Sequence, residues 1–189
     1  MLDSDGSSRD ADEQVVTGTR RWIERAVIGL NLCPFAKLPF GRGAIGYAVS
    51  AARDTVQLRN DLRDALRLLV AADPLEFETS LLIHPHVLGD FLDYNDFLDE
   101  ADAVLVELEL DGTIQIASFH PDYQFADAAP TAIENATNRS PYPTLHLLRE
   151  SSIERAVKGP INVDEIPPTN TKTLRKLGRV GWDALWENT

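Results

Sequence analysis

Short apolar segments alternate with amphipathic segments along this chain, and that alternation constrains the fold more than any single motif does. Residues 44–49, Thr79–Ile83 and residues 103–110 have the length and composition of strands. One helical segment joins each of these strands to the next, at residues 54–72 and 87–101. Because crossovers within one sheet are right-handed, a single connecting helix makes successive strands parallel. The sequence therefore predicts a sheet that is covered by helices.

A turn signal at Asp111 and Gly112 predicts that the chain then reverses into a β-hairpin. Its second strand would be residues 113–119, and a further strand would be Thr144–Arg149. Matching of apolar faces across the hairpin favours a three-residue loop with Gly112 in the left-handed conformation. The fold class is therefore α/β, or α+β, with a mixed sheet of about five strands, a β-hairpin and packed helices.

The length of 189 residues predicts a single domain. Residues 1–14 are polar and acidic without apolar periodicity, which predicts a disordered acidic tail before a globular α/β domain at 15–189. Further helices are predicted at 15–31, 131–137, 151–158 and 169–186, the last weakened by Gly178 and Gly181. Residues 161–168 are predicted to be an extended connector.

The net charge of −12, from 30 acidic and 18 basic residues, argues against nucleic acid or an anionic membrane as the main partner. Residues 68–138 contain 15 acids and no lysine or arginine. This window is either a solvated acidic surface or a face for a basic partner. A local basic patch would still bind a small anionic molecule.

One cysteine, Cys33, excludes an intramolecular disulfide. The first fourteen residues do not resemble a signal peptide, and no apolar run reaches the ~18 residues of a membrane span. We therefore expect a cytoplasmic, reduced setting.

Three polar loops are predicted to meet at one edge of the sheet. In the predicted topology, the loop before the first strand, the loop after residues 113–119 and the loop before Thr144–Arg149 share that edge, with His84 at the opposite one. The loops carry Cys33, Lys37, Arg42, His120, Asp122, Tyr123, Gln124, Asn138, Arg139 and Ser140.

Cys33, His120 and Asp122 are the candidate catalytic residues. Cys33 is either a nucleophile or a small buried hydrophobe. His120 is either a general acid or base, or a histidine satisfied by backbone at a strand end. Asp122 either orients His120 or forms an Asx turn.

The remaining edge residues are candidates for substrate binding, namely Lys37, Arg42, Tyr123, Gln124, Asn138, Arg139 and Ser140. A guanidinium at Arg139, with Arg42, suits a carboxylate or a phosphate, although a salt bridge to the acidic surface would also explain Arg139. His84 and His86 lack a third ligand at diagnostic spacing, so no metal site is predicted, and no cofactor is indicated.

Three phrases, LNLCPFAK from Leu30, FHPDYQF from Phe119 and NRSPYPTLHLLRE from Asn138, resemble the uncharacterised family classed as domain of unknown function 1415. The resemblance extends over residues 22–186 and implies no activity, cofactor or catalytic residue.

The leading hypothesis is a cytoplasmic enzyme of unknown reaction that acts on a small anionic substrate at a Cys/His/Arg site. The alternatives are a non-catalytic small-ligand-binding domain that uses the same pocket and an interaction module that uses the acidic face.

Overall fold

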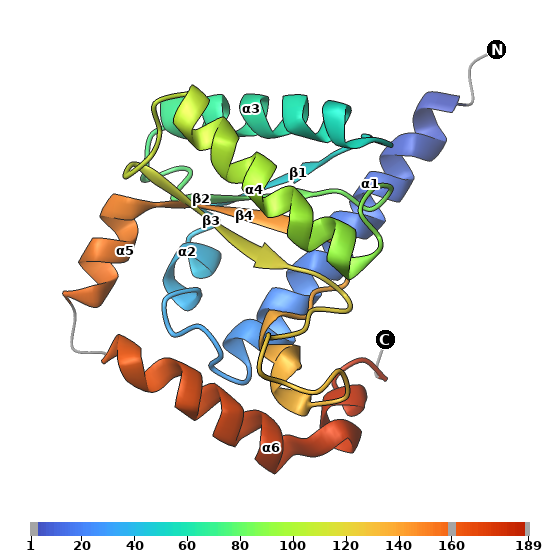
Figure 1. Cartoon of the computed structure of the whole chain (residues 1–189), viewed down its shortest axis with the longest axis vertical. Coiled ribbons are helices and arrows are strands. Elements are labelled where there is room, and N and C mark those ends of the chain that lie inside the picture. The colour runs from blue at the N-terminus through green and yellow to red at the C-terminus, as the bar shows by residue number, and fades with distance from the viewer. Residues whose placement is uncertain (1–3, 159–161, 188–189) are drawn as a thin grey trace.

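The structure is a computed structural model that describes residues 4–158 and 162–187 of the chain. Four strands form one mixed sheet: β1 Ile45–Val49, β2 Thr79–Ile83, β3 Ile114–Phe119 and β4 Thr144–Arg149. The helical elements around the sheet (Figure 1) are α1 Ser4–Trp22, η1 Ile23–Ile28, α2 Lys37–Gly41, α3 Thr55–Ala71, α4 Phe91–Glu107, η2 Ile133–Asn138, α5 Glu150–Val157, η3 Val163–Glu165 and α6 Ile166–Ala184.

The strand order is β1-β2-β4-β3, with β1 and β2 parallel and β4 antiparallel to both of its neighbours. Strands β2 and β3 therefore run in the same direction on either side of β4. We call the edge where β1, β2 and β3 end, at Val49, Ile83 and Phe119, the carboxyl edge. The opposite edge, at Ile45 and Thr79, is the amino edge.

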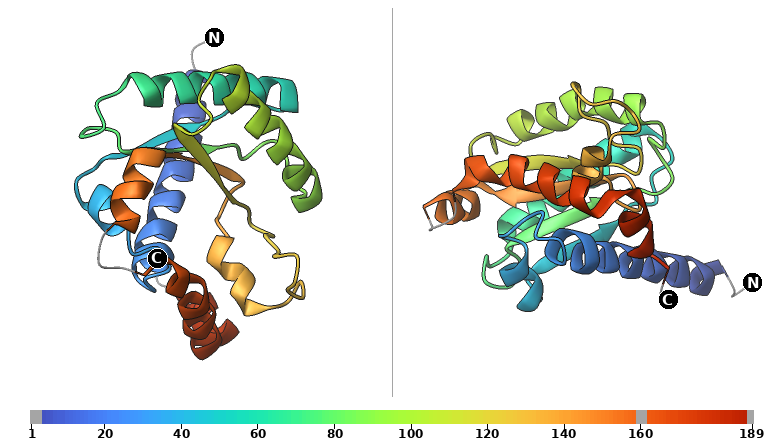
Figure 2. Two further views of the ribbon diagram at one scale, coloured as in Figure 1. Left: turned by 60° about the vertical axis from the view of Figure 1, so that its left-hand side comes forward. Right: turned by 90° about the horizontal axis from the view of Figure 1, so that it is seen from below.

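Two hydrophobic cores lie on the two faces of the sheet. Helices α3 and α4 cover one face, where α3 buries the residues that its amphipathic pattern predicts, Leu58, Leu62, Ala65, Leu66 and Leu69. Helix α1 and the π-helix η1 cover the other face with Trp22, Ile23 and Ala26. Figure 2 shows the sheet between these layers, with α6 farther out on the α1 side.

The prediction of an α/β fold with a mixed sheet is confirmed, but the sheet has four strands rather than five. Residues 103–107, predicted as strand, continue α4, where Val104 and Leu105 are buried and Val106 is 66% exposed. That burial follows helical rather than strand spacing. Glu109, with a left-handed φ of 56°, ends the helix. Gly112 has the expected positive φ of 72°, but it lies in the turn between α4 and β3 and not in a β-hairpin.

Several element bounds also differ from the sequence-based prediction. Helix α1 continues towards the N-terminus beyond residue 15 as far as Ser4, although a disordered tail was expected there. The expected connector 161–168 begins outside the described residues, and its described part forms η3 and the start of α6. The predicted weak point at Gly178 is confirmed, because its φ of 67° interrupts α6.

The missing hairpin changes which loops meet. Since α4 replaces the expected strand, β3 runs parallel to β2 instead of opposing it. The expectation that His84 and His120 lie at opposite edges is therefore wrong, since both follow strands that end at the carboxyl edge.

Candidate functional site

Two histidines and a tyrosine pack together at the carboxyl edge. His84 follows β2, His120 follows β3, and neither side chain is exposed. The Tyr94 ring of α4 stacks on His84 with a centroid distance of 5.7 Å and lies 5.1 Å from the ring of His120. The Tyr94 hydroxyl donates to the Thr144 carbonyl at 2.9 Å and accepts from the Phe119 N–H at 3.1 Å. Tyr94 thereby ties α4 to two strands.

His84 is held as a neutral ring. Its Nδ1 lies 3.1 Å from the Val87 carbonyl, and because a carbonyl only accepts, Nδ1 carries the hydrogen. Nε2 is buried and has no hydrogen-bond partner among the described residues. Burial lowers the pKa of His84 to about 4, since a charged ring would lose its solvation there.

Both nitrogens of His120 are hydrogen-bonded to the backbone. Nε2 donates to the Leu88 carbonyl at 3.1 Å, and Nδ1 accepts from the Asp122 N–H at 3.0 Å. Burial lowers the pKa of His120, an effect that the charges of Asp122 and Asp90 partly oppose. Leu88 has a φ of 57°, a left-handed conformation that is uncommon for leucine, and the bond from His120 stabilises it. A proton transfer at His120 would break one of these bonds.

The other predicted residues of this edge also bind backbone. Arg139 donates from Nε to the Tyr123 carbonyl at 3.1 Å and from Nη2 to the Pro130 carbonyl at 3.0 Å. The side chains of Gln124, Asn138 and Ser140 donate to the carbonyls of Ala128, Ser118 and Tyr142, respectively. The structure thus brings seven candidates together: His120, Asp122, Tyr123, Gln124, Asn138, Arg139 and Ser140. Their hydrogen bonds shape the loop that joins β3 to β4.

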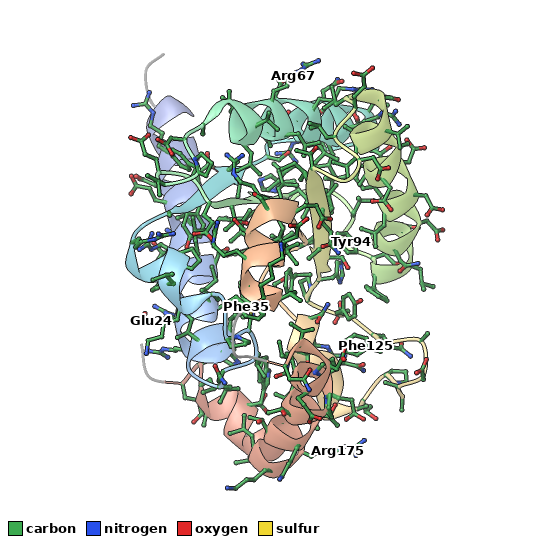
Figure 3. The ribbon with its side chains drawn as sticks, turned by 90° about the vertical axis from the view of Figure 1, so that its left-hand side faces the viewer. Glu24, Phe35, Arg67, Tyr94, Phe125 and Arg175 are labelled. Atoms are coloured by element: carbon green, nitrogen blue, oxygen red, sulfur yellow. The ribbon has the colours of Figure 1, made fainter. Side chains whose placement is uncertain are left out.

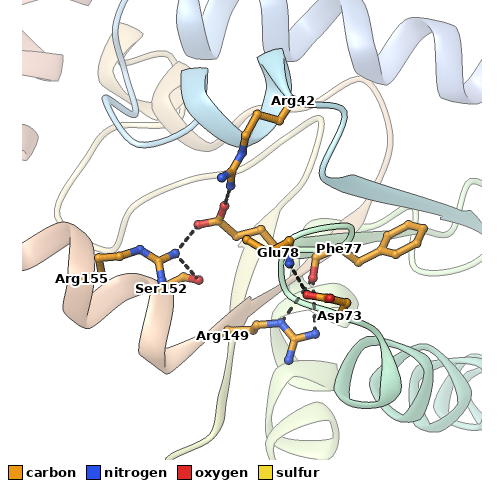
Figure 4. Close-up of polar contacts among 8 residues, drawn as sticks. Arg42, Asp73, Phe77, Glu78, Arg149, Ser152 and Arg155 are labelled. Atoms are coloured by element: carbon orange, nitrogen blue, oxygen red, sulfur yellow. Dashed lines mark hydrogen bonds and ion pairs between the residues drawn. The ribbon is translucent and has the colours of Figure 1, made fainter.

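Arg42 lies at the amino edge, away from these seven residues. Its guanidinium forms an ion pair with Glu78, and Arg155 of α5 donates to the same carboxylate at 2.8 Å (Figure 4). Arg149, beside this pair, donates to the carbonyls of Leu69, Ala72 and Phe77. The expected grouping of Arg42 with His120 is therefore wrong, because the two residues flank opposite ends of the parallel strands.

Cys33 lies in the loop after η1, on the α1 side of the sheet. Burial raises the pKa of its thiol, which disfavours the thiolate that a nucleophile needs. The preceding Leu32 packs with Ala136 and Leu174, and Lys37 is exposed at the start of α2. Figure 3 shows Phe35 of this loop in a different layer from Tyr94. The loop of Cys33 thus packs beside η2 and α6 through Leu32, whereas His84 and His120 pack against Tyr94 of α4.

A pocket of about 260 Å³ lies next to Cys33, between its loop and the start of α6. We call it the amide pocket because three asparagines line it, with the full lining being Asn31, Pro34, Asn162, Glu165, Ile166, Thr169 and Asn170. The Nδ2 of Asn170 donates to the Leu32 carbonyl at 2.8 Å, so α6 and the loop are joined at the pocket wall.

Sequence reasoning missed the amide pocket because its two walls are far apart in the chain. Asn31 has a φ of 55°, a conformation that asparagine tolerates better than most residues, and it turns the chain out of η1. The only local feature of the sequence that bears on this pocket was the predicted end of the first helix near Asn31. Nothing in the sequence indicates that α6 would pack there.

Among the described residues, no group of three or more histidine, cysteine, aspartate or glutamate side chains converges as a metal site requires. Within residues 4–158 and 162–187, no helix is both long enough and apolar enough to cross a membrane.

Fold and loop geometry define an α/β protein with a four-stranded mixed sheet between two helical layers. The chain belongs to the family described as "Protein of unknown function (DUF1415)", whose profile matches residues 14–184. The resemblance carried by the three sequence phrases is thereby confirmed. No curated protein and no solved structure matches the chain.

Proposed function

We propose that the protein is a small-ligand-binding domain and that its ligand occupies the amide pocket. The observation that carries the proposal is the pocket itself, a concave space of about 260 Å³ with hydrogen-bonding side chains on two separate elements. Small-molecule sites are commonly concave and combine apolar walls with a few polar groups. Pro34 and Ile166 supply the apolar walls, whereas Asn31, Thr169 and Asn170 supply amide and hydroxyl groups.

The hydrogen bonding of the two candidate regions supports this choice. At the carboxyl edge, His120 and Arg139 already donate to backbone carbonyls. In the amide pocket, Asn170 donates from Nδ2 to the Leu32 carbonyl. This bond orients the Asn170 side chain and leaves its Oδ1 available to accept a hydrogen bond from a ligand. A side chain held by one atom and presenting another is suited to bind a ligand with little loss of conformational entropy.

The catalytic hypothesis, with Cys33, His120 and Arg139 acting on a small anionic substrate, stays a prediction. The raised pKa of Cys33 and the lowered pKa of His120 both weaken it, because each shift favours the form that does not carry charge. The interaction-module alternative likewise stays a prediction, and the acidic residues of α4 are its basis.

Ligand-observed NMR with a library of small polar molecules tests the proposal on the full chain. We expect several binders, and we expect Thr169→Trp to abolish their binding because the indole would fill the pocket. Thr169 is exposed on α6, and threonine and tryptophan have similar helix propensities, so the variant should fold. Lys176→Trp, at an exposed position on the same helix outside the pocket, is the matched control.

Binders that are lost with Thr169→Trp and kept with Lys176→Trp would support the proposed function. Binders that both variants retain would place the ligand site elsewhere and overturn it, and so would the absence of any binder.

A further inference from the structure

We infer that the ligand of the amide pocket is a small hydroxylated amine, bound through its ammonium group by Glu165 and through its hydroxyls by the pocket amides. This inference rests on the proposed function and adds the chemical class of the ligand. It also reverses the sign of charge that the sequence suggested, since the expected substrate was an anion.

The charge of the pocket is the first reason. Glu165 is the ionisable side chain among the seven lining residues, and no lysine or arginine is among them. The whole chain carries a net charge of −12, which raises the local concentration of cations around it. An anion would therefore meet a negative wall within a negative protein.

The start of α6 is the second reason. The N-terminus of a helix often binds an anion, because its first N–H groups have no partner within the helix. In α6 the first turn contains Pro167 and Pro168, which have no N–H to offer. This helix start therefore lacks much of the donor set that an anion would need, although it borders the pocket through Ile166 and Thr169.

The basic side chains at the two strand edges are the third reason. Arg42 and Arg155 pair with Glu78 at the amino edge. Arg139 bonds to backbone carbonyls at the carboxyl edge. None of these guanidinium groups lines the amide pocket. The arginines best suited to bind an anion therefore have protein partners outside the pocket.

The hydrogen-bonding atoms of the pocket fit hydroxyl groups. Amide side chains and a threonine hydroxyl can both donate and accept, as a hydroxyl does, so Asn31 and Thr169 can each bind one in either sense. Asn162 already accepts from the Asp164 N–H at 3.2 Å, which fixes its amide and directs its NH₂ group as a donor. The volume of about 260 Å³ lies below the ~300–1,000 Å³ of drug-sized sites and limits the ligand to a small molecule.

Three matched compounds test the inference, since they share a three-carbon oxygenated skeleton and differ in charge. The probes are serinol (2-amino-1,3-propanediol) as the cation, glycerol as the neutral compound and glycerate as the anion. Dissociation constants of the full chain for each are measured by ligand-observed NMR at pH 7 and low salt. We expect serinol to bind tightest and glycerate weakest, with serinol favoured over glycerol by about two- to fivefold, the range of a solvent-exposed ion pair.

Glu165→Gln separates the role of the carboxylate from that of the pocket shape. We expect this variant to lower serinol affinity to that of glycerol and to leave glycerol binding unchanged. Glu76→Gln, which alters an exposed carboxylate outside the pocket, should change neither affinity.

The outcomes distinguish the two proposals. If glycerate binds tightest and Thr169→Trp abolishes its binding, the pocket is a ligand site but the inferred amine class is wrong. If serinol binds with equal affinity to the native protein and to Glu165→Gln, the inferred role of Glu165 is wrong. If Thr169→Trp leaves the binding of all three probes unchanged, the proposed function itself fails.

Discussion

The two edges of the sheet differ in that buried, uncharged histidines help to hold the carboxyl edge, whereas ionised side chains hold the amino edge. At the carboxyl edge, the uncharged rings of His84 and His120 bond to the carbonyls of Val87 and Leu88. At the amino edge, the permanently charged Arg149 bonds to three carbonyls, while Arg42 and Arg155 share Glu78. Both sets tie loops to the sheet. The carboxyl edge combines the two neutral rings with the charged Arg139, whereas the donors named at the amino edge are all ionised.

This difference teaches that polar residues gathered at the end of a strand need not form a reaction site. Loop carbonyls at a buried strand end must find donors, because an unpaired buried carbonyl is costly. Histidine supplies such a donor without charge, and arginine supplies several with charge. The difference also means that the two edges should respond differently to acid and to salt.

The largest expected effect is a loss of stability in acid, to which His84 at the carboxyl edge contributes together with His146 in the middle of β4, because burial lowers the pKa of each to about 4. The pKa of His84 is about 4 in the folded protein and ~6.5 when unfolded, so its contribution is present above pH ~6.5 and lost as the pH falls through 4. At pH 4 this loss amounts to about 3 kcal/mol. Urea unfolding at pH 7.5 and at pH 4 measures it.

His84→Gln is the variant that assigns this acid effect. The variant keeps a polar side chain that does not titrate, so its stability should fall less between pH 7.5 and pH 4 than that of the native protein. His86→Gln, at an exposed position two residues on, should behave like the native protein. Equal pH dependence in all three proteins would contradict the account of His84.

The next effect is expected at Tyr94. Tyr94→Phe removes a buried hydroxyl that serves the Thr144 carbonyl and the Phe119 N–H, so two backbone groups lose their partner. We expect the free energy of unfolding to fall by about 2–3 kcal/mol, the cost of unsatisfied buried groups. Tyr123→Phe, which leaves these two bonds intact, should change stability by less than about 1 kcal/mol. Equal losses in the two variants would contradict the role assigned to the Tyr94 hydroxyl.

A smaller effect is expected at Arg139. Lysine keeps the charge but cannot donate to the Tyr123 and Pro130 carbonyls at once, so Arg139→Lys should lower the free energy of unfolding by about 1–2 kcal/mol. Arg67→Lys, at an exposed position on α3, should stay within about 0.5 kcal/mol. If Arg139→Lys keeps native stability and weakens the binding of phosphate or a small carboxylate, the anion-site hypothesis gains over the structural one.

The smallest effect is expected at the ion pair of Arg155 with Glu78. The side chain of Arg155 is 67% exposed, so its ion pair with Glu78 is screened by solvent. A double-mutant cycle of Arg155→Ala and Glu78→Gln should give a coupling energy of about 0.2–1 kcal/mol that shrinks at high salt. A coupling that is larger and independent of salt would mean that solvent does not screen this ion pair as described.

The fold was largely predictable from local pattern. Strands β1, β2 and β4 and helix α3 follow their apolar periodicity and their capping residues, as Asp54 at the start of α3 illustrates by accepting from the Gln57 N–H. The error at residues 103–110 arose because apolar residues and glutamate alternate over residues 106–110, as they would along a strand. Only packing against the sheet decides between strand and helix for so short a run.

The grouping of His120 with Asn138 and Arg139 was predictable, because both loops flank antiparallel neighbours β3 and β4. Whether Arg42 and His120 share an edge depends on the direction of β3 relative to β2. Because residues 103–107 were predicted as a strand and belong to α4, the predicted direction of β3 was reversed. The amide pocket could not be predicted, because Asn31 and Asn170 meet only through packing between distant segments. Such contacts leave no periodic signal in a single sequence.

We propose that ligand binding uses the amide pocket, while the histidines of the carboxyl edge hold the fold. An NMR titration of the isotope-labelled full chain with serinol tests it most directly. The account predicts shifts of the signals of Asn31, Thr169 and Asn170, with the ring signals of His84 and His120 unchanged. Shifts at His120 and Arg139, with the signals of the pocket residues unchanged, would contradict it.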